Sequence, residues 1–334
     1  MRAIVLVGGF GTRLQPLTLA TPKQMLPVVD RPMIEWVVGH LGEHGVNEAI
    51  LALGYRPDAF MAAYPDAECA GVRLRYAVED SPLDTAGAIR FAASEAGIDE
   101  RFLVVNGDVL TDLDIDALVT FHDAAGGAGT IHLHPVDDPS RYGVVPIDAD
   151  GRVVEFVEKP LRDQAPSRWI NAGAYVLEPE VLNRIDPEGK VSIERVTFPA
   201  LAGEGRLFGF QTETYWIDAG TPATYLQAQL DLVDGHRATT PPAVAADATV
   251  ADGAKVEHAV LMAGASVADG ASVVDSAVLP GARVERGATV RDADVGPDAV
   301  VGTDAVVDGG TALGAGAVVE PGEILTDVRR PGAA

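Results

Sequence analysis

The sequence has a single cysteine, Cys69, only four lysines and no run of eighteen consecutive apolar residues. One cysteine excludes an internal disulfide framework, which fits a reducing compartment. Without a long apolar run, no segment is expected to span a membrane. Met1-Arg2 passes directly into a short apolar stretch followed by glycines, which is not the layout of a secretory signal peptide. We therefore expect a cytoplasmic protein that does not insert into membranes.

Positive charge is scarce in this chain. Its 334 residues include 25 Lys and Arg against 49 Asp and Glu, which gives a formal charge of −24. That balance argues against binding to nucleic acid or to an anionic membrane, because both need a basic surface. An enzyme of this composition that binds a polyanion must concentrate its few cations locally. The positions of the lysines are therefore informative: Lys23, Lys159, Lys190 and Lys255.

Residues 1–232 alternate short apolar runs with helical patterns. The apolar runs predict buried strands at 3–7, 48–53, 74–78 and 102–105. The intervening patterns predict helices at 32–44, 85–96 and 115–124. This alternation is typical of an α/β fold, a Rossmann-like, mostly parallel sheet with helices on both faces. Ligands of such sheets lie beyond the carboxyl ends of the strands, so the loop after the first strand is the first candidate site.

Aromatic residues are absent beyond Pro242, where an Ala/Gly/Val/Asp repeat begins. The segments 251–256, 268–273 and 285–290 align with an offset of 17 residues, and aliphatic residues recur at spacings of 6, 5 and 6. A helix would need spacings of three or four, and disordered tracts lack such a register. The repeat predicts a triangular solenoid that resembles the left-handed β-helix of hexapeptide-repeat proteins, with about five coils over 243–325. Residues 233–242 are then a linker.

The loop after the first strand reads Gly8-Gly9-Phe10-Gly11-Thr12-Arg13-Leu14. Glycines allow a backbone to approach a phosphate closely, and the guanidinium of Arg13 matches phosphate oxygens. The loop is not a dinucleotide-binding fingerprint, because Leu14 stands where the last glycine should be. It is not a Walker A loop either, since no Gly-Lys-Ser/Thr follows. Alone, it is also compatible with an ordinary tight turn.

Further motifs follow this loop along the chain. They are Thr21-Pro-Lys23-Gln-Met-Leu-Pro27, Asn106-Gly107-Asp108, Glu158-Lys159-Pro160, Asn171-Ala172-Gly173 and Trp216-Ile-Asp218-Ala-Gly-Thr221. In this order they resemble the signature of the sugar nucleotidylyltransferase family (nucleoside-diphosphate-sugar pyrophosphorylases). With its repeat, the chain is most similar to bacterial mannose-1-phosphate guanylyltransferases that carry a C-terminal β-helix.

The resemblance implies that an oxygen of a sugar 1-phosphate attacks the α-phosphorus of a nucleoside triphosphate and releases diphosphate, with Mg2+ as the cofactor. Mg2+ takes carboxylate and phosphate oxygens, so Asp108 and Asp218 are its expected ligands. The expected catalytic residues are Arg13, Lys23 and Asp108. The residues expected to hold the nucleotide are Leu6, Gly8, Gly9, Gly11, Thr12, Arg13, Lys23, Glu79, Asp84, Thr85 and Gly107. Those expected to hold the sugar phosphate are Gly143, Glu158, Lys159, Asn171 and Gly173.

The nucleobase depends on fewer residues. In the family the position of Glu79 lies near the base edge, where a carboxylate can accept the two donors of guanine, which favours GTP with mannose 1-phosphate. Glu79 could instead pair with Arg75. Guanylyl and adenylyl relatives have Pro-Leu-Gly-Thr-Ala-Gly where this chain has Asp84 in place of the first glycine. Asp84 would either contact the nucleotide or cap the helix that starts near Thr85.

Other functions stay open. Glucose 1-phosphate with dTTP, UTP or ATP, or a cyclitol phosphate with GTP, would use the same fold, because a fold does not settle substrate choice. A non-catalytic regulatory subunit is a second alternative, although such proteins typically lose residues that this chain keeps. Left-handed β-helices also carry acyltransferase sites with a histidine base, and His258 is the only histidine of the repeat. A short β-helix exposes its terminal coils, so we expect a homo-oligomer formed through residues 243–325.

Overall fold

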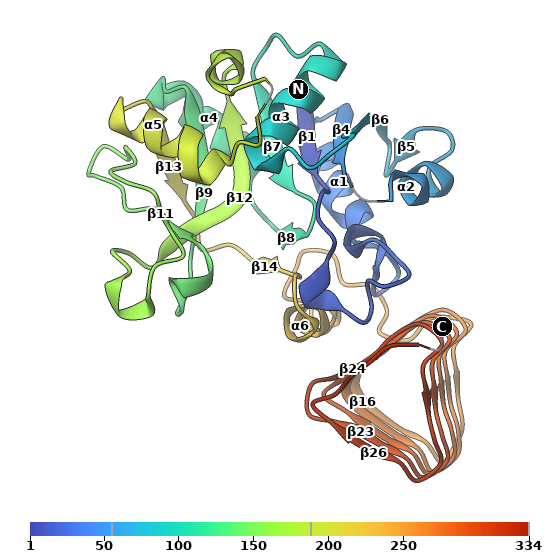
Figure 1. Ribbon diagram of the computed structural model, residues 1–334. Coiled ribbons are helices and arrows are strands. Elements are labelled where there is room, and N and C mark those ends of the chain that lie inside the picture. Colours follow the sequence, from blue (N-terminus) through green and yellow to red (C-terminus); the bar gives the residue numbers. More distant parts are fainter. Residues whose placement is uncertain (55, 188, 333–334) are drawn as a thin grey trace. The chain divides into compact units, whose positions relative to one another are not determined.

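The computed structural model describes residues 1–54, 56–187 and 189–332. The chain forms two compact units, and the β-helix of the second stands out in Figure 1 by its triangular coils. The first unit consists of Met1–Gly9 and Glu35–Trp216, and the second consists of Phe10–Ile34 with the chain from Ile217 onward. A short N-terminal segment therefore belongs to the unit that carries the C-terminal repeat. The domain boundaries at 232 and 243 stay a prediction.

The first unit is built on a sheet that has ten strands within the described residues. At its centre β1 (Arg2–Leu6) lies parallel to β4 (Glu48–Leu53) and β7 (Phe102–Asn106), and β6 (Val72–Val78) extends the parallel part beyond β4. On the other side of β7, the antiparallel strand β12 (Trp169–Leu177) makes the sheet mixed. The remaining strands are β5 (Glu68–Cys69), β9 (Gly129–Pro135), β10 (Gly143–Val144), β11 (Val157–Glu158) and β13 (Leu207–Gln211).

Helices cover both faces of this sheet, as predicted. Ile4 and Val104 pack into a core with α3, whereas Val105 points the other way and lines a cavity with Trp36 of α1 and Ile115 of α4. The predicted helices begin and end within one residue of their observed bounds. The helices of the chain are α1 (Met33–Glu43), α2 (Pro57–Ala63), α3 (Asp84–Ala96), α4 (Ile115–Ala125), α5 (Phe198–Gly203) and α6 (Pro222–Val233). No helix among the described residues is long and apolar enough to cross a membrane.

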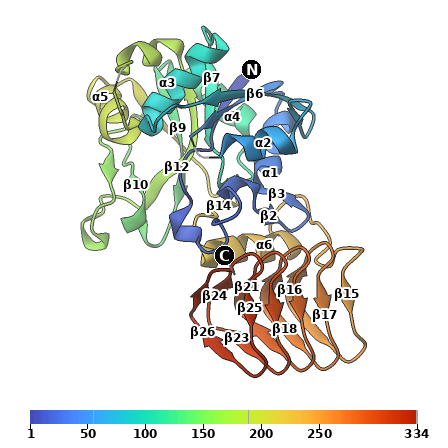
Figure 2. The ribbon, with the colours of Figure 1, turned by 45° about the vertical axis from the view of Figure 1, so that its right-hand side comes forward.

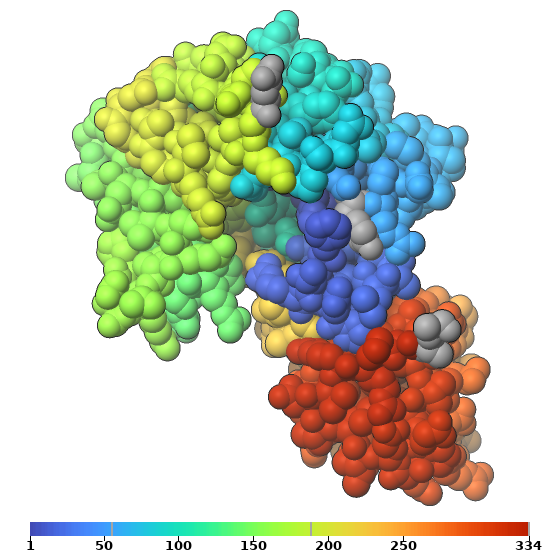
Figure 3. All heavy atoms as spheres, in the orientation of Figure 1, coloured from blue at the N-terminus to red at the C-terminus, as the bar shows by residue number. Residues whose placement is uncertain are grey.

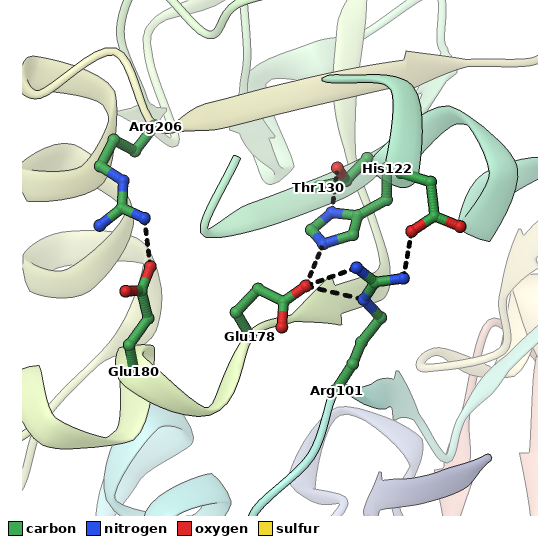
Figure 4. A network of polar contacts seen from close by, with 7 residues as sticks. Arg101, His122, Thr130, Glu178, Glu180 and Arg206 are labelled. Carbon is green, nitrogen blue, oxygen red and sulfur yellow. Dashed lines mark hydrogen bonds and ion pairs between the residues drawn. The ribbon is translucent and has the colours of Figure 1, made fainter. Parts of the chain in front are cut away.

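A polar network fixes the amino end of β7 in the first unit (Figure 4). Glu178, which follows β12, accepts a hydrogen bond from Arg101 Nε at 2.7 Å, and its Oε1 lies 3.2 Å from His122 Nε2. The other ring nitrogen of His122 lies 2.8 Å from the hydroxyl of Thr130. Burial lowers the pKa of His122, although the hydrogen bond to Glu178 works against that shift. Because Arg101 precedes β7, this network lies at the edge of the sheet opposite the expected ligand edge.

The second unit contains the predicted β-helix, seen from the side in Figure 2. Parallel strands of successive coils form its faces, and one aliphatic side chain after another, such as Val267, Val273 and Val284, is buried inside. The strands of one face are β15 (Thr249–Val250), β17 (Ser266–Val267), β19 (Arg283–Val284), β22 (Val300–Val301) and β25 (Val318–Val319). The other strands are β16 (Lys255–Leu261), β18 (Ser272–Val278), β20 (Thr289–Arg291), β21 (Ala293–Val295), β23 (Val306–Asp308), β24 (Thr311–Leu313), β26 (Ile324–Thr326) and β27 (Arg329–Arg330).

The register confirms the 17-residue repeat and shows one exception to it. Lys255 pairs with Ser272, and Thr289 pairs with Val306, each 17 residues on. From Ala293, which pairs with Thr311, the offset becomes 18. The extra residue lies at Gly309-Gly310, where both glycines have positive φ values of 64° and 80°. Two left-handed glycines accommodate the insertion at a corner of the coil without disturbing the faces on either side.

A helix and the N-terminal segment of the second unit are joined by hydrogen bonds. α6 packs against β16, β18 and β21. The hydroxyl of Tyr225 in α6 donates to the carbonyl of Pro27, and the side chain of Gln229 accepts from the amide of Val29 at 2.9 Å. These bonds attach the short hairpin of β2 (Pro27–Val28) and β3 (Arg31–Pro32) to α6. Segments about 200 residues apart in the sequence thus become one structure.

His258 lies at a corner of the first coil and joins it to the end of α6. Its backbone φ is 45°, its Nδ1 lies 2.5 Å from Asp275 Oδ1, and its Nε2 lies 2.9 Å from Asp234 Oδ2. The hydrogen bond to Asp275, together with that to Asp234, raises the pKa of His258, against a smaller effect of burial. Both ring nitrogens are taken up by carboxylates, which does not suit the general base of an acyltransferase.

We predict that the contacts of His258 with Asp234 and Asp275 stabilise the second unit at about pH 6 and no longer do so at alkaline pH. A folded-state pKa raised above the unfolded value of about 6.5 adds stability that is complete below that value and is lost as the pH rises through the folded pKa. His258→Gln should therefore lower the melting temperature of the β-helix at about pH 6 and match the wild type at about pH 9. Asp252→Asn, an exposed acid of the same coil, is the control. An equal loss at both pH values would contradict the prediction.

Candidate functional site

The carboxyl ends of parallel strands meet at one edge of the sheet in the first unit. Leu6, at the end of β1, lies in register with Asn106 of β7, and the amide of Gly107 donates to the carbonyl of Leu6 at 2.9 Å. Asp108 follows directly and is half-buried. Glu79 follows β6, and its amide donates to the end of β4 at 2.9 Å. Four of the sequence-predicted site residues are therefore brought to the same edge.

Glu79 is held by backbone rather than by an arginine. Its Oε2 accepts a hydrogen bond from the amide of Leu83 at 3.1 Å, and Arg75 pairs with Glu48 instead. Burial raises the pKa of Glu79, and the bond from Leu83 partly opposes that shift. The alternative pairing of Glu79 with Arg75 is thus wrong. The carboxylate is fixed in a loop position and keeps lone pairs for further donors.

Asp84 has a backbone conformation that glycine adopts most easily. Asp84 has a φ of 61°, in the left-handed region that favours glycine, and it is the first residue of α3. Its Oδ1 accepts from the amide of Thr85 at 2.9 Å. The N-cap residue of α3 is Leu83, which makes no side-chain cap. The predicted cap is thus only partly correct, because the side chain of Asp84 binds the next amide from inside the helix.

Sequence reasoning missed Glu194, which lies beside two of the predicted residues. It belongs to a π-helical turn, Ile193–Thr197, a type of turn that is frequent at functional sites. Its Oε2 accepts from the hydroxyls of Thr85 at 2.7 Å and Ser192 at 2.6 Å. Burial raises the pKa of the Tyr175 hydroxyl, and the charges of Glu194 and Glu158 raise it further. The contact of Glu194 with Thr85, 109 residues away in the chain, is one that no spacing in the sequence reveals.

The Asn171-Ala172-Gly173 motif packs directly against the Asn106 motif. A Cβ on Gly173 would lie 2.5 Å from Asn106 Nδ2, and Gly173 has a φ of 78°. The Asn171 side chain donates from Nδ2 to the hydroxyl of Tyr175 at 2.9 Å and accepts from the amide of Gly173 at 3.0 Å. Only glycine allows this approach, so two motifs separated by 65 residues depend on one missing Cβ.

Lys159 and Glu158 form an ion pair beside Gly143. The distance from Lys159 Nζ to Glu158 Oε1 is 2.9 Å, and β10 and β11 pair Gly143 with Glu158. The amide of Lys159 donates to the carbonyl of Tyr142 at 3.0 Å. A Cβ on Gly143 would lie 2.5 Å from the ring of Phe156, so this glycine is needed for packing. The structure thus brings three of the predicted sugar-phosphate residues together.

Trp216 is a second residue that was not assigned a role. Its indole Nε1 donates to the carbonyl of Ala172 at 2.9 Å. The ring of His134 stacks on it at a centroid distance of 5.3 Å, and Tyr142 meets its edge at 5.6 Å. Burial lowers the pKa of His134, which keeps the stacked imidazole neutral near pH 7. The tryptophan therefore links the Asn171 loop to the Tyr142 loop.

The glycine-rich loop begins in the first unit, with Gly8 and Gly9, and continues into the second. There a 3-10 turn, Thr12–Leu14, follows Gly11, whose φ is 60°. A Cβ on Gly11 would lie 2.9 Å from Thr18 Cγ2 and 3.4 Å from the Cβ of Lys23. The close approach places the predicted lysine beside the predicted phosphate loop.

Arg13 and Asp218 also meet within the second unit. The distance from Arg13 NH2 to Asp218 Oδ2 is 3.8 Å, and the side chain of Asp218 is 19% exposed against 61% for Arg13. A Cβ on Gly220 would lie 2.6 Å from Asp218 Oδ1 and 2.8 Å from Arg13 NH2. Thr221 then caps α6, with its hydroxyl accepting from the amide of Thr224. An exposed guanidinium next to a half-buried carboxylate suits the binding of phosphate oxygens with a cation.

A separate group of possible metal ligands lies elsewhere in the first unit. Among the described residues, His44, Asp114 and Asp116 offer ligand atoms that all lie within 4.8 Å of one another. Asp114 caps α4 by accepting from the amide of Ala117 at 2.9 Å, and His44 Nδ1 lies 3.0 Å from Asp116 Oδ2. These hydrogen bonds at the start of α4 are enough to explain why the three side chains lie close together. Neither of the predicted Mg2+ ligands belongs to it.

Comparison with known proteins supplies two family matches. Residues 2–235 match the family described as nucleotidyl transferase, and residues 222–319 match the one described as GlmU-like, C-terminal hexapeptide. A mannose-1-phosphate guanylyltransferase of Mycobacterium tuberculosis is 39% identical over 267 residues, which is 78% of this chain and 73% of that protein. A mannose-1-phosphate guanyltransferase of Aspergillus fumigatus is 43% identical over 230 residues, which is 68% of this chain and 62% of that protein.

Solved structures agree with these matches. HddC from Yersinia pseudotuberculosis superposes with a TM-score of 0.60 at 30% identity, and the match covers 68% of this chain and 97% of that one. The same protein in complex with GMP-PN superposes with a TM-score of 0.58 at 29% identity.

We predict that Gly173 tolerates no side chain. Gly97, at the end of α3, has a similar φ of 62°, but a Cβ added there would have no atom within 4 Å, so Gly97→Ala carries the backbone strain alone. Gly173→Ala adds a steric overlap and should lower the free energy of unfolding by about 1–3 kcal/mol more than the control does. Chemical denaturation of both variants measures this difference. Equal losses would contradict the tight contact with Asn106.

Proposed function

The chain belongs to the nucleotidyl transferase family, and from this premise we propose that it converts GTP and mannose 1-phosphate to GDP-mannose and diphosphate. The observation that carries the proposal is the identity of 39–43% with mannose-1-phosphate guanylyltransferases. The complex of HddC with GMP-PN supports the same base. The chain spans only 62% of the fungal relative, so the activity of that whole protein comes to this chain as part of the proposal.

The reaction requires two negatively charged substrates to be bound next to each other. A phosphate oxygen of the sugar phosphate forms a bond to the α-phosphorus of GTP while the bond to the bridging oxygen breaks, and diphosphate leaves with that electron pair. No protein nucleophile is needed, so the contribution of the protein is positioning and the stabilisation of charge. We assign the β- and γ-phosphates to Arg13 and the amides of Gly9–Thr12. Lys23 then lies at the α-phosphate, where charge develops.

We assign Mg2+ to Asp108 and Asp218. Both are half-buried carboxylates, which is the type of donor that Mg2+ combines with phosphate oxygens and waters. When bound, the ion would neutralise charge on the triphosphate. The ion pair of Asp218 with Arg13 supports the assignment, because one guanidinium can then bind a phosphate oxygen and orient the carboxylate together.

The sugar phosphate is assigned to the Lys159 region. Lys159 would hold the phosphate, and Glu158, Asn171, the Gly173 backbone and the Gly143 backbone would face the sugar hydroxyls. Glu194 joins this set in the proposal, because its carboxylate is held by the hydroxyls of Thr85, at 2.7 Å, and Ser192, at 2.6 Å. Carboxylates that are already ordered by hydroxyl donors can accept further hydroxyls at little entropic cost.

The nucleotide is assigned to the loop that carries Glu79, Asp84 and Thr85. Leu6, Gly8 and Gly107 belong to the same proposed nucleotide site. Guanine presents two adjacent donors, and a carboxylate held by the Leu83 amide supplies the matching acceptors. Cytosine, uracil and thymine lack that pair of donors. We further propose, from the repeat alone, that the β-helix serves assembly in the cytoplasm.

Diphosphate release across a grid of nucleotides and sugar 1-phosphates tests the function. The combination of GTP and mannose 1-phosphate with Mg2+ should dominate, and Asp108→Ala should reduce its rate at least about 100-fold. A dominant signal from another pair would keep the family and overturn the substrate assignment. No signal for any pair would favour a regulatory subunit.

Selectivity between bases tests Glu79 separately. Glu79→Gln replaces an acceptor by a donor and removes a charge-assisted hydrogen bond worth about 1.5–3 kcal/mol. The ratio of kcat/KM for GTP to that for dTTP should therefore fall at least about tenfold. Glu68→Gln, an exposed glutamate of the same unit, is the control. If both variants keep the wild-type ratio, Glu79 does not read the base.

A further inference from the structure

The turn of the β2–β3 hairpin contains a residue in an unfavourable backbone conformation. Val28 pairs with Arg31, so Val29 and Asp30 form a two-residue turn. Hairpin turns of this length need a positive φ at their first central residue, which glycine, asparagine or aspartate usually supplies. Val29 adopts a φ of 59° although it is β-branched, which makes it a genuine outlier. Such strain persists only where the surrounding structure holds it, and it is frequent at functional sites.

Two side chains of α6 hold this turn in place. Gln229 is fully buried, and its Oε1 accepts a hydrogen bond from the amide of Val29 at 2.9 Å. Tyr225, also fully buried, donates from its hydroxyl to the carbonyl of Pro27. Burial raises the pKa of Tyr225 well above its usual range, so the hydroxyl keeps the proton that it donates. Residues four apart lie on one face of a helix, so both hydrogen bonds come from the same face of α6.

The β-helix supports α6 from the other side. α6 packs against β16, β18 and β21. Figure 2 shows the helix between the β2–β3 hairpin and the coils, and in Figure 3 the gold atoms of α6 adjoin blue atoms of the N-terminal segment. Ala228 and Leu232 are as fully buried as the two polar residues. A helix that is packed on both sides gives Tyr225 and Gln229 a rigid base, because close-packed interiors deform little.

The hairpin in turn fixes Lys23. The 3-10 turn Lys23–Met25 lies directly before it, and the amide of Leu26 donates to the carbonyl of Lys23 at 3.1 Å. The carbonyl of Leu26 accepts from the amide of Met33, at the other end of the hairpin, at 3.0 Å. α6 itself begins four residues after Asp218. Within the second unit, one helix therefore sets the spacing between the proposed catalytic lysine and a proposed metal ligand.

We propose that Gln229 and Tyr225 are positioning residues for the transfer reaction, which hold the strained Val29 turn and thereby keep Lys23 in place relative to Asp218. Neither side chain is assigned a contact with a substrate. A displacement of about 1 Å in a group that acts on the transition state can lower the rate on the order of 100-fold. The inference deepens the proposed function and rests on it for the role of Lys23.

Hydrogen exchange of the full chain without substrates tests the structural step. Gln229→Met nearly keeps the side-chain volume but removes the acceptor for the Val29 amide. The amides within residues 23–31 should therefore exchange at least about tenfold faster than in the wild type. Gln227→Met, the same substitution at an exposed position of α6, is the matched control and should leave their exchange unchanged. Tyr225→Phe should accelerate exchange in the same segment, and unchanged exchange in both Gln229→Met and Tyr225→Phe would overturn the inference.

Steady-state kinetics with the substrate pair that the wild type turns over fastest tests the catalytic step. Gln229→Met should lower kcat at least about tenfold and change either KM less than about threefold, because Lys23 is assigned to charge that develops in the transition state. In a Lys23→Ala background the same substitution should have little further effect, since it acts through that lysine. Val29→Gly removes the strain of the turn and should restore part of the kcat lost in Gln229→Met.

Three kinetic outcomes would each overturn the positioning role. They are a kcat of Gln229→Met equal to that of Gln227→Met, an undiminished loss in the Lys23→Ala background, and no recovery with Val29→Gly. Circular dichroism checks that each variant is folded, and Tyr225→Phe takes the place of Gln229→Met if the latter is not. A wild type that turns over no substrate pair would count against the proposed function, and the exchange of residues 23–31 would then decide this inference by itself.

Discussion

Electrostatics places the strongest constraint on this molecule, because the proposed reaction requires a strongly acidic chain to bind two phosphorylated substrates. The cations that could do so are few, and the structure keeps each beside a fixed neighbour. Arg13 lies against Asp218, Lys159 pairs with Glu158, and Lys23 packs beside Gly11. Prior pairing orders these long side chains before any ligand arrives, which lowers the entropic cost of binding. Backbone amides supply the remaining positive potential, and the glycine-rich loop is suited to direct several of them at one phosphate.

Close backbone approach is the second requirement, and it explains why the motifs contain glycine. Gly173 lies against Asn106, and Gly220 lies against Asp218 and Arg13, so side chains far apart in the sequence are brought together where no Cβ intervenes. Asp84 and Lys159 are site residues that adopt a left-handed φ without being glycine. At Asp84 the side chain accepts a hydrogen bond from the next amide. The local strain there is of order 1–3 kcal/mol.

The sequence predicts most of the fold because the signals are local. Strand and helix bounds follow from short apolar runs, and the coil register follows from a valine spacing that one face imposes on the next. It predicts less of the site, because Glu194 and Trp216 acquire their places through tertiary contacts with Thr85 and Ala172. The ion pair of Arg330 with Glu323 in the last coil could not be predicted either. Two opposite charges seven residues apart in a loop form no distinctive sequence pattern.

We propose Asp108 and Asp218 as the metal ligands, and Mn2+ binding in the presence of a slowly reacting GTP analogue tests this proposal most directly. Asp108→Asn and Asp218→Asn should each weaken Mn2+ binding at least about tenfold. Because two ligands of one ion act as a unit, the double variant should bind only slightly more weakly than either single variant. Wild-type Mn2+ affinity in either single variant, or fully additive losses in the double variant, would contradict the account.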